Sequence, residues 1–303
     1  MHALLAALLI MGALTPNTGQ NTVRWTNPRV DFPSAIFVGD THKGGVLPDT
    51  DGTGAVTDAN LRQLEAIRLI RGKAHPLGGF VDEPLMKFQV GDFTHDTTMS
   101  AAALSAWFAL WEGQRILDGN HDDNPVRNRI KTLYGSLNWG VLVGNIYFQA
   151  ITENFTALNN TTPPTQALIE GEITTKLAAR PADEPKILLF HRAFSGGYPA
   201  EWAAGAADAL ETLCNAKNVV GIIHGHDHYS QNYLWRGIPT FSPGSVAQGG
   251  LVPPYGTLYP ESFLVLRMGD GWYDVAEYCF GYNVSRVWTP GVWGFAEKVT
   301  YAA

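Results

Sequence analysis

Residues 219–228, VVGIIHGHDH, join a short apolar run to a cluster of three histidines and one aspartate. The run from Val219 to Ile223 is rich in β-branched residues and has the length of a buried strand. Polar residues begin where the run ends, and Gly225 permits a tight turn there. The stretch therefore predicts a buried strand whose carboxyl end carries side chains able to bind a metal ion.

Four other apolar runs end in the same way. They are residues 34–38, 87–90, 115–117 and 186–190, followed respectively by Gly39-Asp40-Thr41-His42, Gly91-Asp92, Gly119-Asn120-His121-Asp122 and His191. The segments between them have helical character, and this alternation predicts an α/β protein. Loops diverge at the carboxyl edge of such sheets, so side chains that are distant in sequence meet there. Carboxylate, amide and imidazole ligands without thiolate suit Mn, Fe, Zn or Mg ions.

In their order along the chain, these residues resemble the signature of the calcineurin-like metallophosphoesterases, which is D-x-H, G-D, G-N-H-D, H and G-H-x-H. The similarity extends from about Ala35 to Ser245 and includes the later Pro243-Gly244-Ser245. It implies an α/β fold of four layers, α/β/β/α, in which two mixed β-sheets lie face to face between helices. It also implies a hydrolase that cleaves a phosphomonoester or phosphodiester by attack of a hydroxide that bridges two metal ions.

The resemblance implies two sets of metal ligands that share one aspartate. Asp40, His42, Asp92 and His228 would hold the first ion, and Asp92, Asn120, His191 and His226 the second. A shared carboxylate can hold two ions about 3.5–4 Å apart. By the same resemblance His121 is the general acid that protonates the leaving oxygen, a role worth about 10²–10⁴-fold in rate.

One residue near the second motif departs from the common family pattern, and the partner of His121 stays open. His95 stands three residues after Asp92, where other branches of the family carry an aspartate or a tyrosine, and this histidine is similar to that of the double-strand-break-repair nucleases. Either Asp96 or Asp122 can replace the missing carboxylate as the partner of His121.

Two further residues beside the motifs also have open roles. Arg192 follows His191, and it can contact a substrate phosphate or cover the surface. His224 stands where relatives carry an apolar residue before G-H-x-H. It is either a hydrogen-bonded histidine at a strand end or a residue that contacts substrate or supports a ligand.

The charge of the chain bears on its partners. The 303 residues include 21 Lys and Arg against 28 Asp and Glu, a net charge of −7, without a block of basic residues. A track for a DNA backbone is rich in Lys and Arg, so the charge favours a small or medium-sized phosphoester over nucleic acid. A DNA nuclease and a noncatalytic scaffold of the same fold are the alternatives. A scaffold would be expected to lose ligands, whereas this chain keeps the full set and His121.

Periodicity predicts further elements. Helices are expected at residues 58–71, 100–111, 125–133, 165–177 and 202–213, and strands at 231–235, 238–241, 262–266 and 272–279. We expect these strands of the C-terminal third to complete a second sheet. Residues 47–54 and 159–164 are rich in turn-forming residues and predict surface loops.

Residues 1–25 are either a leader segment or an ordinary buried part of the chain, and residues 26–303 are expected to form a single domain. The apolar stretch that begins at Ala3 is too short to span a bilayer and has the length of a signal-peptide core, but it lacks a basic flank. A secreted or periplasmic location and a cytoplasmic one are therefore equally open. Cys214 and Cys279 are either two buried apolar residues or a disulfide of an exported protein. The sequence gives no indication of the oligomeric state.

Overall fold

The computed structural model describes residues 31–43, 56–95, 99–157, 160–192, 194, 202–245, 261–280 and 291–302. The described residues from Phe32 onward belong to one compact unit. The leader expected at residues 1–25 and the loop expected at residues 47–54 lie outside the described residues. No helix in the described ranges is long and apolar enough to cross a membrane.

The first sheet contains the strands that precede the first three motifs. Its order is β14-β13-β12-β1-β2-β3. The strands are β1 (Asp31–Val38), β2 (Phe80–Val90), β3 (Gln114–Leu117), β12 (Ser262–Gly269), β13 (Trp272–Cys279) and β14 (Val292–Thr300). The sheet is mixed, because β1 pairs with β12 in antiparallel fashion while β2 and β3 are parallel. Beyond β1 and β2, a parallel bridge joins Lys43 to Thr94 and keeps the first two motifs together.

The second sheet contains the strands that precede the last two motifs, in the order β10-β11-β9-β8-β5-β4. They are β4 (Gly140–Val143), β5 (Ile146–Ala150), β8 (Lys186–Phe190), β9 (Val219–His224), β10 (Gln231–Trp235) and β11 (Ile238–Ser242). β8 lies parallel to both β5 and β9, so the chain leaves these strands at the same edge. A separate hairpin is formed by β6 (Asn154–Ala157) and β7 (Asn160–Thr162).

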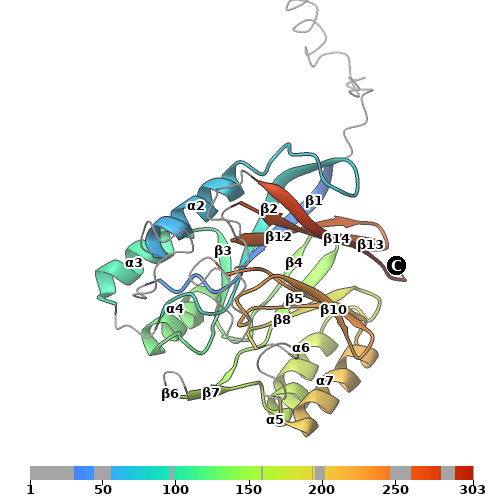
Figure 1. The fold of residues 1–303 in the computed structure, drawn as a ribbon. Helices are drawn as coiled ribbons and strands as arrows, with labels where there is room; N and C mark the ends of the chain where they lie inside the picture. Colours follow the sequence, from blue (N-terminus) through green and yellow to red (C-terminus); the bar gives the residue numbers. More distant parts are fainter. Residues whose placement is uncertain are drawn as a thin grey trace, which may run out of the picture. The chain divides into compact units, whose positions relative to one another are not determined.

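Helices cover the outer faces of the two sheets (Figure 1). Beside the first sheet lie α2 (Val56–Arg68), α3 (Ala101–Leu110) and α4 (Asn124–Tyr134), and beside the second lie α5 (Gln166–Leu168), η1 (Ile169–Ile173), α6 (Thr174–Ala178) and α7 (Ala204–Ala216). Side chains of β8 alternate between two cores, as the period of a strand requires. Leu189 packs into the cluster that contains Phe37 of the first sheet, whereas Leu188 packs with Leu210 of α7. The predicted α/β/β/α fold is therefore confirmed.

Local signals fix α4, the helix that follows the third motif. The Asp123 side chain accepts a hydrogen bond from Val126 N (3.1 Å) and caps the first turn, the usual role of an aspartate there. Pro125 stands in that first turn, where its missing N–H costs nothing. The helix ends at Gly135, which has φ +78° and donates its N–H to Lys131 O (2.8 Å).

Two predictions about the C-terminal part and the loops are wrong. The later strands do not complete one sheet: β10 and β11 extend the second sheet, whereas β12, β13 and β14 extend the first. Periodicity identifies a strand but not its partner, which explains the error. Residues 160–162, expected in a loop, form β7 by pairing with β6.

The helix expected at residues 165–177 is present and contains one turn of π-helix. Both Cys214 and Cys279 are buried free thiols.

Candidate metal centre

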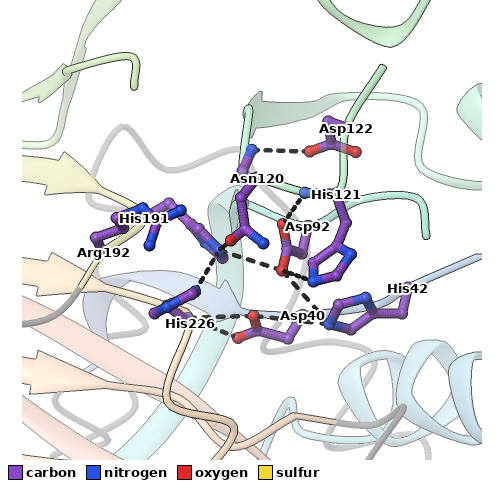
Figure 2. Close-up of polar contacts among 12 residues, drawn as sticks. Asp40, His42, Asp92, Asn120, His121, Asp122, His191, Arg192 and His226 are labelled. Atoms are coloured by element: carbon purple, nitrogen blue, oxygen red, sulfur yellow. Dashed lines mark hydrogen bonds and ion pairs between the residues drawn. The ribbon is translucent and has the colours of Figure 1, made fainter. Parts of the chain in front are cut away.

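The five sequence motifs meet at one place, as Figure 2 shows for most of their residues. Nε2 of His42 lies 3.1 Å from Nε2 of His228. Nε2 of His191 lies 3.3 Å from Nδ1 of His226 and 3.1 Å from Oδ1 of Asn120. Side chains from both sheets thus point their ring nitrogens and oxygens at each other, although acceptor atoms repel unless a proton or a cation lies between them.

Asp92 occupies the middle of this cluster. Its Oδ2 lies 3.5 Å from Nε2 of His42 and 3.2 Å from Nε2 of His191, and it accepts no aligned hydrogen bond within the described ranges. Its Oδ1 accepts a hydrogen bond from the backbone N–H of His121 (2.9 Å). One buried carboxylate oxygen therefore faces imidazoles on both sides.

Two groups of side chains around Asp92 have the geometry to hold a metal ion. Asp40, His42, Asp92 and His228 form one group, and Asp92, His191 and His226 form the other. Within each group the ligand atoms all lie within 4.8 Å of one another. Asn120 lies next to the second group, because its Oδ1 is 3.1 Å from Nε2 of His191. Both groups consist of residues that the resemblance named, with Asp92 in each, and His42, His95 and His121 form a third group with the same spacing of ligand atoms.

The backbone at these side chains is strained. Asp40, His42, Asp92, His226 and His228 all have positive φ, between +45° and +75°. Only seven non-glycine residues have positive φ in the described part of the chain, so most of them are ligand candidates. The left-handed region costs a residue with a Cβ about 1–2 kcal/mol, and such outliers collect at functional sites.

Two glycines allow the motifs to approach this closely. Gly91 has φ +96°, and a Cβ built on it would lie 2.1 Å from Nδ1 of His191. A Cβ built on Gly119 would lie 2.2 Å from Oδ1 of Asp92. Any side chain at either position would push the candidate ligands apart.

Hydrogen bonds fix which nitrogen of the histidines is free to bind an ion. Nδ1 of His191 lies 3.0 Å from the carbonyl oxygen of Val90, which can only accept, so Nδ1 carries the proton and Nε2 keeps its lone pair. For Nε2 of His42 to bind an ion, its Nδ1 must carry the proton, and Nδ1 of His95 lies 2.9 Å away to accept it. Donation of the second N–H to a fixed acceptor is typical of metal-bound histidines.

Sequence and structure both relate the chain to known proteins. Residues 34–230 match the family model described as calcineurin-like phosphoesterase. The chain belongs to this family. Its fold is similar to that of a dimetal phosphatase from Danio rerio, with a TM-score of 0.59 at 12% identity, over 89% of this chain and 99% of the other.

Two further solved structures show weaker similarity to this calcineurin-like phosphoesterase. Wild-type Vps29 from Entamoeba histolytica in complex with Zn²⁺ has a TM-score of 0.44 at 13% identity, over 89% of this chain and 99% of the other. Vps29 from Chaetomium thermophilum has a TM-score of 0.45 at 9% identity, over 90% and 99%. No curated protein matches the sequence. Family membership supports a metal-dependent phosphoesterase.

Burial and charge set the protonation of the candidate ligands in this calcineurin-like phosphoesterase. Burial lowers the pKa of His191 and lowers that of His42 well below its usual value, so both rings are neutral at pH 7 and can offer a lone pair. Burial opposes ionisation of Asp92, but His191 holds its pKa well below the usual range. Burial and then Asp92 raise the pKa of Asp40 well above its usual range. A bound cation would relieve this repulsion between two carboxylates.

His121 and His95 lie together beside the ligand groups. Their rings stack at 4.8 Å between centroids with 14° between planes. Nε2 of His121 is 3.9 Å from Oδ2 of Asp92, and the His121 side chain is 24% exposed while that of Asp92 is buried. His95 thus contacts both His42 and His121 and can orient the two rings.

Asp122 supports the loops of the site. Its Oδ1 accepts hydrogen bonds from N (2.7 Å) and Oγ1 (3.0 Å) of Thr94, and its Oδ2 from N of Phe93 (3.1 Å) and N of Gly119 (2.9 Å). Burial, together with the charge of Asp92, raises the pKa of Asp122 to about 7 against the pull of these donors. Both oxygens are engaged by the two loops, so Asp122 holds the second and third motifs together. Asp96, the alternative partner of His121, lies outside the described residues.

Arg192 and His224 both bind protein groups. Nη2 of Arg192 donates to O (3.1 Å) and Oγ1 (2.9 Å) of Thr161, and its Nε lies 3.1 Å from Oε1 of Glu153. Nδ1 of His224 lies 2.8 Å from Gly225 O and its Nε2 lies 2.9 Å from the hydroxyl of Tyr233. Burial lowers the pKa of His224 to about 4, as expected for a neutral, hydrogen-bonded histidine at a strand end.

The sequence motifs did not identify several residues that support the site. Ser245 Oγ donates to Asp40 O (3.0 Å), and Thr41 Oγ1 donates to Phe93 O (3.0 Å). Asp118, Arg127, Thr152 and Glu153 form buried contacts behind Asn120 and His191. Thr41 and Ser245 stand within quoted stretches of the sequence and Asp118 directly precedes one, but no supporting role was predicted for them.

Proposed function

We propose that the chain hydrolyses a phosphomonoester or phosphodiester at a centre of two metal ions. The position of Asp92 carries this proposal, because its buried Oδ2 lies between His42 of one ligand group and His191 of the other. One ion would be held by Asp40, His42, Asp92 and His228, and the other by Asp92, Asn120, His191 and His226. Such ions, when bound, supply activation of a water molecule and neutralise phosphoryl oxygens.

The residues of the chain prepare the site for this chemistry. Backbone N–H groups of His226 (3.1 Å to each oxygen of Asp40) and of His121 (2.9 Å to Asp92) hold the two carboxylates in place. The neutral, buried imidazoles of His42 and His191 present fixed lone pairs. Because these groups are oriented before substrate arrives, little reorganisation is needed during the reaction.

His121 is the residue that donates a proton to the leaving oxygen in this proposal. Its imidazole is partly exposed beside the buried Asp92, so it can reach an oxygen that departs toward solvent. Stacking on His95 limits the rotation of its ring.

A substrate panel tests the proposal. Metal-free protein is reconstituted separately with Mn²⁺, Zn²⁺, Fe²⁺ and Mg²⁺ and assayed on p-nitrophenyl phosphate, its diester, a cyclic nucleotide, a phospholipid diester and single-stranded DNA. We expect hydrolysis of at least one phosphoester, lost on chelation and restored by metal. Protein that holds two ions and hydrolyses none of them would refute the catalytic proposal and favour a scaffold. Cleavage of single-stranded DNA alone would favour the nuclease.

A further inference from the structure

The segment that follows β5 joins the two sheets beside the candidate metal centre. Asn120 follows β3 at the edge of the first sheet, whereas His191 follows β8 in the second. Their side chains nevertheless lie 3.1 Å apart. One ion can bind both only if the two sheets are held in a fixed relation. Thr152 and Glu153 contact the turns that carry these two residues.

Thr152 is connected to the turn that carries Asn120. Thr152 Oγ1 donates to Oδ2 of Asp118 (2.7 Å), and the same oxygen forms an ion pair with Nη1 of Arg127. Nη2 of Arg127 donates to the carbonyl oxygen of Gly119 (3.0 Å), the residue directly before Asn120. The side chain of Asp118 is fully buried and that of Arg127 is 3% exposed, so water does not replace these contacts.

Glu153 is connected to the turn that carries His191. Its buried Oε1 lies 3.1 Å from Nε of Arg192, the residue directly after His191. Thr161 of the β6–β7 hairpin donates its hydroxyl to the other oxygen of Glu153, and it accepts from Arg192 through its backbone carbonyl (3.1 Å). Adjacent residues of one segment therefore position one candidate ligand from each sheet.

We propose that this ionic clamp, defined as Asp118, Arg127, Thr152, Glu153, Thr161 and Arg192, sets the affinity of the second metal ion and leaves that of the first ion nearly unchanged. The inference rests on the ligand sets of the proposed function.

Burial raises the pKa of Glu153 to about 8, although the charge of Arg192 opposes this rise. The carboxyl oxygen still faces the Arg192 guanidinium at 3.1 Å, and a buried charge that loses such a partner is destabilised. Loss of the Glu153 carboxyl therefore displaces Arg192 and with it His191. The first ligand group is positioned differently, since Asp40 N donates to Gly91 O (3.2 Å) and His42 N donates to Asp92 O (2.9 Å). These contacts lie within the first sheet and its loops. His228 of this group follows β9 of the second sheet, and it is joined to Asp40 by Ser245, whose N–H donates to His228 O (3.2 Å) and whose Oγ donates to Asp40 O (3.0 Å), not by the clamp. Supporting residues of this kind change metal affinity by about 10–100-fold, and here the change is confined to one ion.

Metal titration of two clamp variants tests the inference without an activity assay. Glu153→Gln keeps the size of the side chain and replaces the carboxyl group with an amide, and Thr152→Val removes only the hydroxyl. Metal-free protein is titrated with Mn²⁺ by calorimetry, and the magnetic coupling of paired Mn²⁺ ions is followed by electron paramagnetic resonance. We expect the second dissociation constant to rise about 10-fold or more and the first to change by less than about two-fold.

A matched control separates this effect from general destabilisation. Asp274→Asn removes the carboxylate of another buried ion pair, in which Asp274 Oδ2 lies 2.6 Å from Nη2 of Arg267. Both residues of this pair lie on strands β12 and β13 of the first sheet. We expect this variant to lose stability and keep both dissociation constants.

Equal weakening of both ions in Glu153→Gln, or an unchanged second constant, would overturn the inference. If Glu153→Gln does not fold, Thr152→Val decides by the same criterion. Wild-type protein that binds two ions but hydrolyses no phosphoester would refute the proposed function and leave the result on the clamp standing. Wild-type protein that binds a single ion would overturn the ligand sets and therefore the clamp.

Discussion

Gly119 is the position where one added methyl group should damage the metal centre most directly. A Cβ built on it would lie 2.2 Å from Oδ1 and 2.3 Å from N of Asp92. Non-bonded heavy atoms approach one another to about 3.5–4.0 Å. The variant Gly119→Ala therefore requires Asp92 or the turn after β3 to move by more than about 1 Å, a distance set by the same contact range.

The expected magnitude follows from that displacement. Overpacking a buried position costs about 1–3 kcal/mol, so we expect the free energy of unfolding of the metal-free protein to fall by this amount. A misplacement of about 1 Å can reduce activity by about 10²-fold. Because Asp92 belongs to both ligand groups, both ions should bind more weakly, unlike the selective effect expected of Glu153→Gln.

The assay combines urea unfolding of the metal-free protein with metal analysis and a rate measurement on the best substrate. Gly171→Ala is the control, since a Cβ there would meet no atom within 4 Å. Alanine is favoured over glycine in a helix by about 0.5–1 kcal/mol, so this variant should keep its metal and be as stable as the wild type or more so. Gly119→Ala with wild-type stability and two bound ions would refute the steric argument.

Three further outcomes are expected. Asp92→Asn should lose bound metal and activity at every pH, because a neutral amide bridges two ions poorly; two bound ions with normal turnover, measured by metal analysis and kcat, would contradict this. His121→Ala should keep both ions and lose about 10²-fold or more in rate on an alkyl phosphoester, but much less on p-nitrophenyl phosphate, whose phenolate leaves without a proton. Equal losses on the two substrates would mean that His121 positions substrate. Burial lowers the pKa of His75 to about 4, against the opposing charge of Asp274, so the unfolded chain protonates first and stability falls as the pH drops from about 6.5 to about 4. In the variant His75→Gln, the free energy of unfolding should fall less steeply over this pH range, by at most about 1.4 kcal/mol per pH unit. Urea unfolding at several pH values measures this, and midpoints that decline as steeply as those of the wild type would contradict the prediction.

The strands that carry the motifs could be predicted from the sequence. Each apolar run before a motif is short and mostly buried in the structure, and four of the five are followed directly by glycine or histidine, as in β8 and β9. Sheets of this kind gather such strand ends at one edge, so the convergence of Asp40, Asp92 and His191 followed from general rules. The resemblance then rested on the order of the motifs along the chain, which no single residue reveals.

The pairing of the C-terminal strands and the role of the segment after β5 could not be predicted. β12 pairs with β1 across more than two hundred residues, and hydrophobic alternation gives no information about such a partner. Gly140–Val143 and Ile146–Ala150 are short strands that pair with each other, and the second of them pairs with β8. Thr152 and Glu153 belong to no motif, and Thr152 bonds Asp118 at a separation of 34 residues.

There is a physical reason why the candidate ligands could be predicted from the sequence and the residues that support them could not. A metal ion accepts few kinds of ligand, so Asp, Asn and His must stand at the ligand positions and leave a pattern in the sequence. The left-handed backbone at Asp40 and Asp92 costs about 1–2 kcal/mol at each residue and must be stabilised by the surrounding structure. Many combinations of polar residues can provide that support. A buried pair such as Glu153 and Arg192 is therefore recognised only when the structure shows which turns it joins.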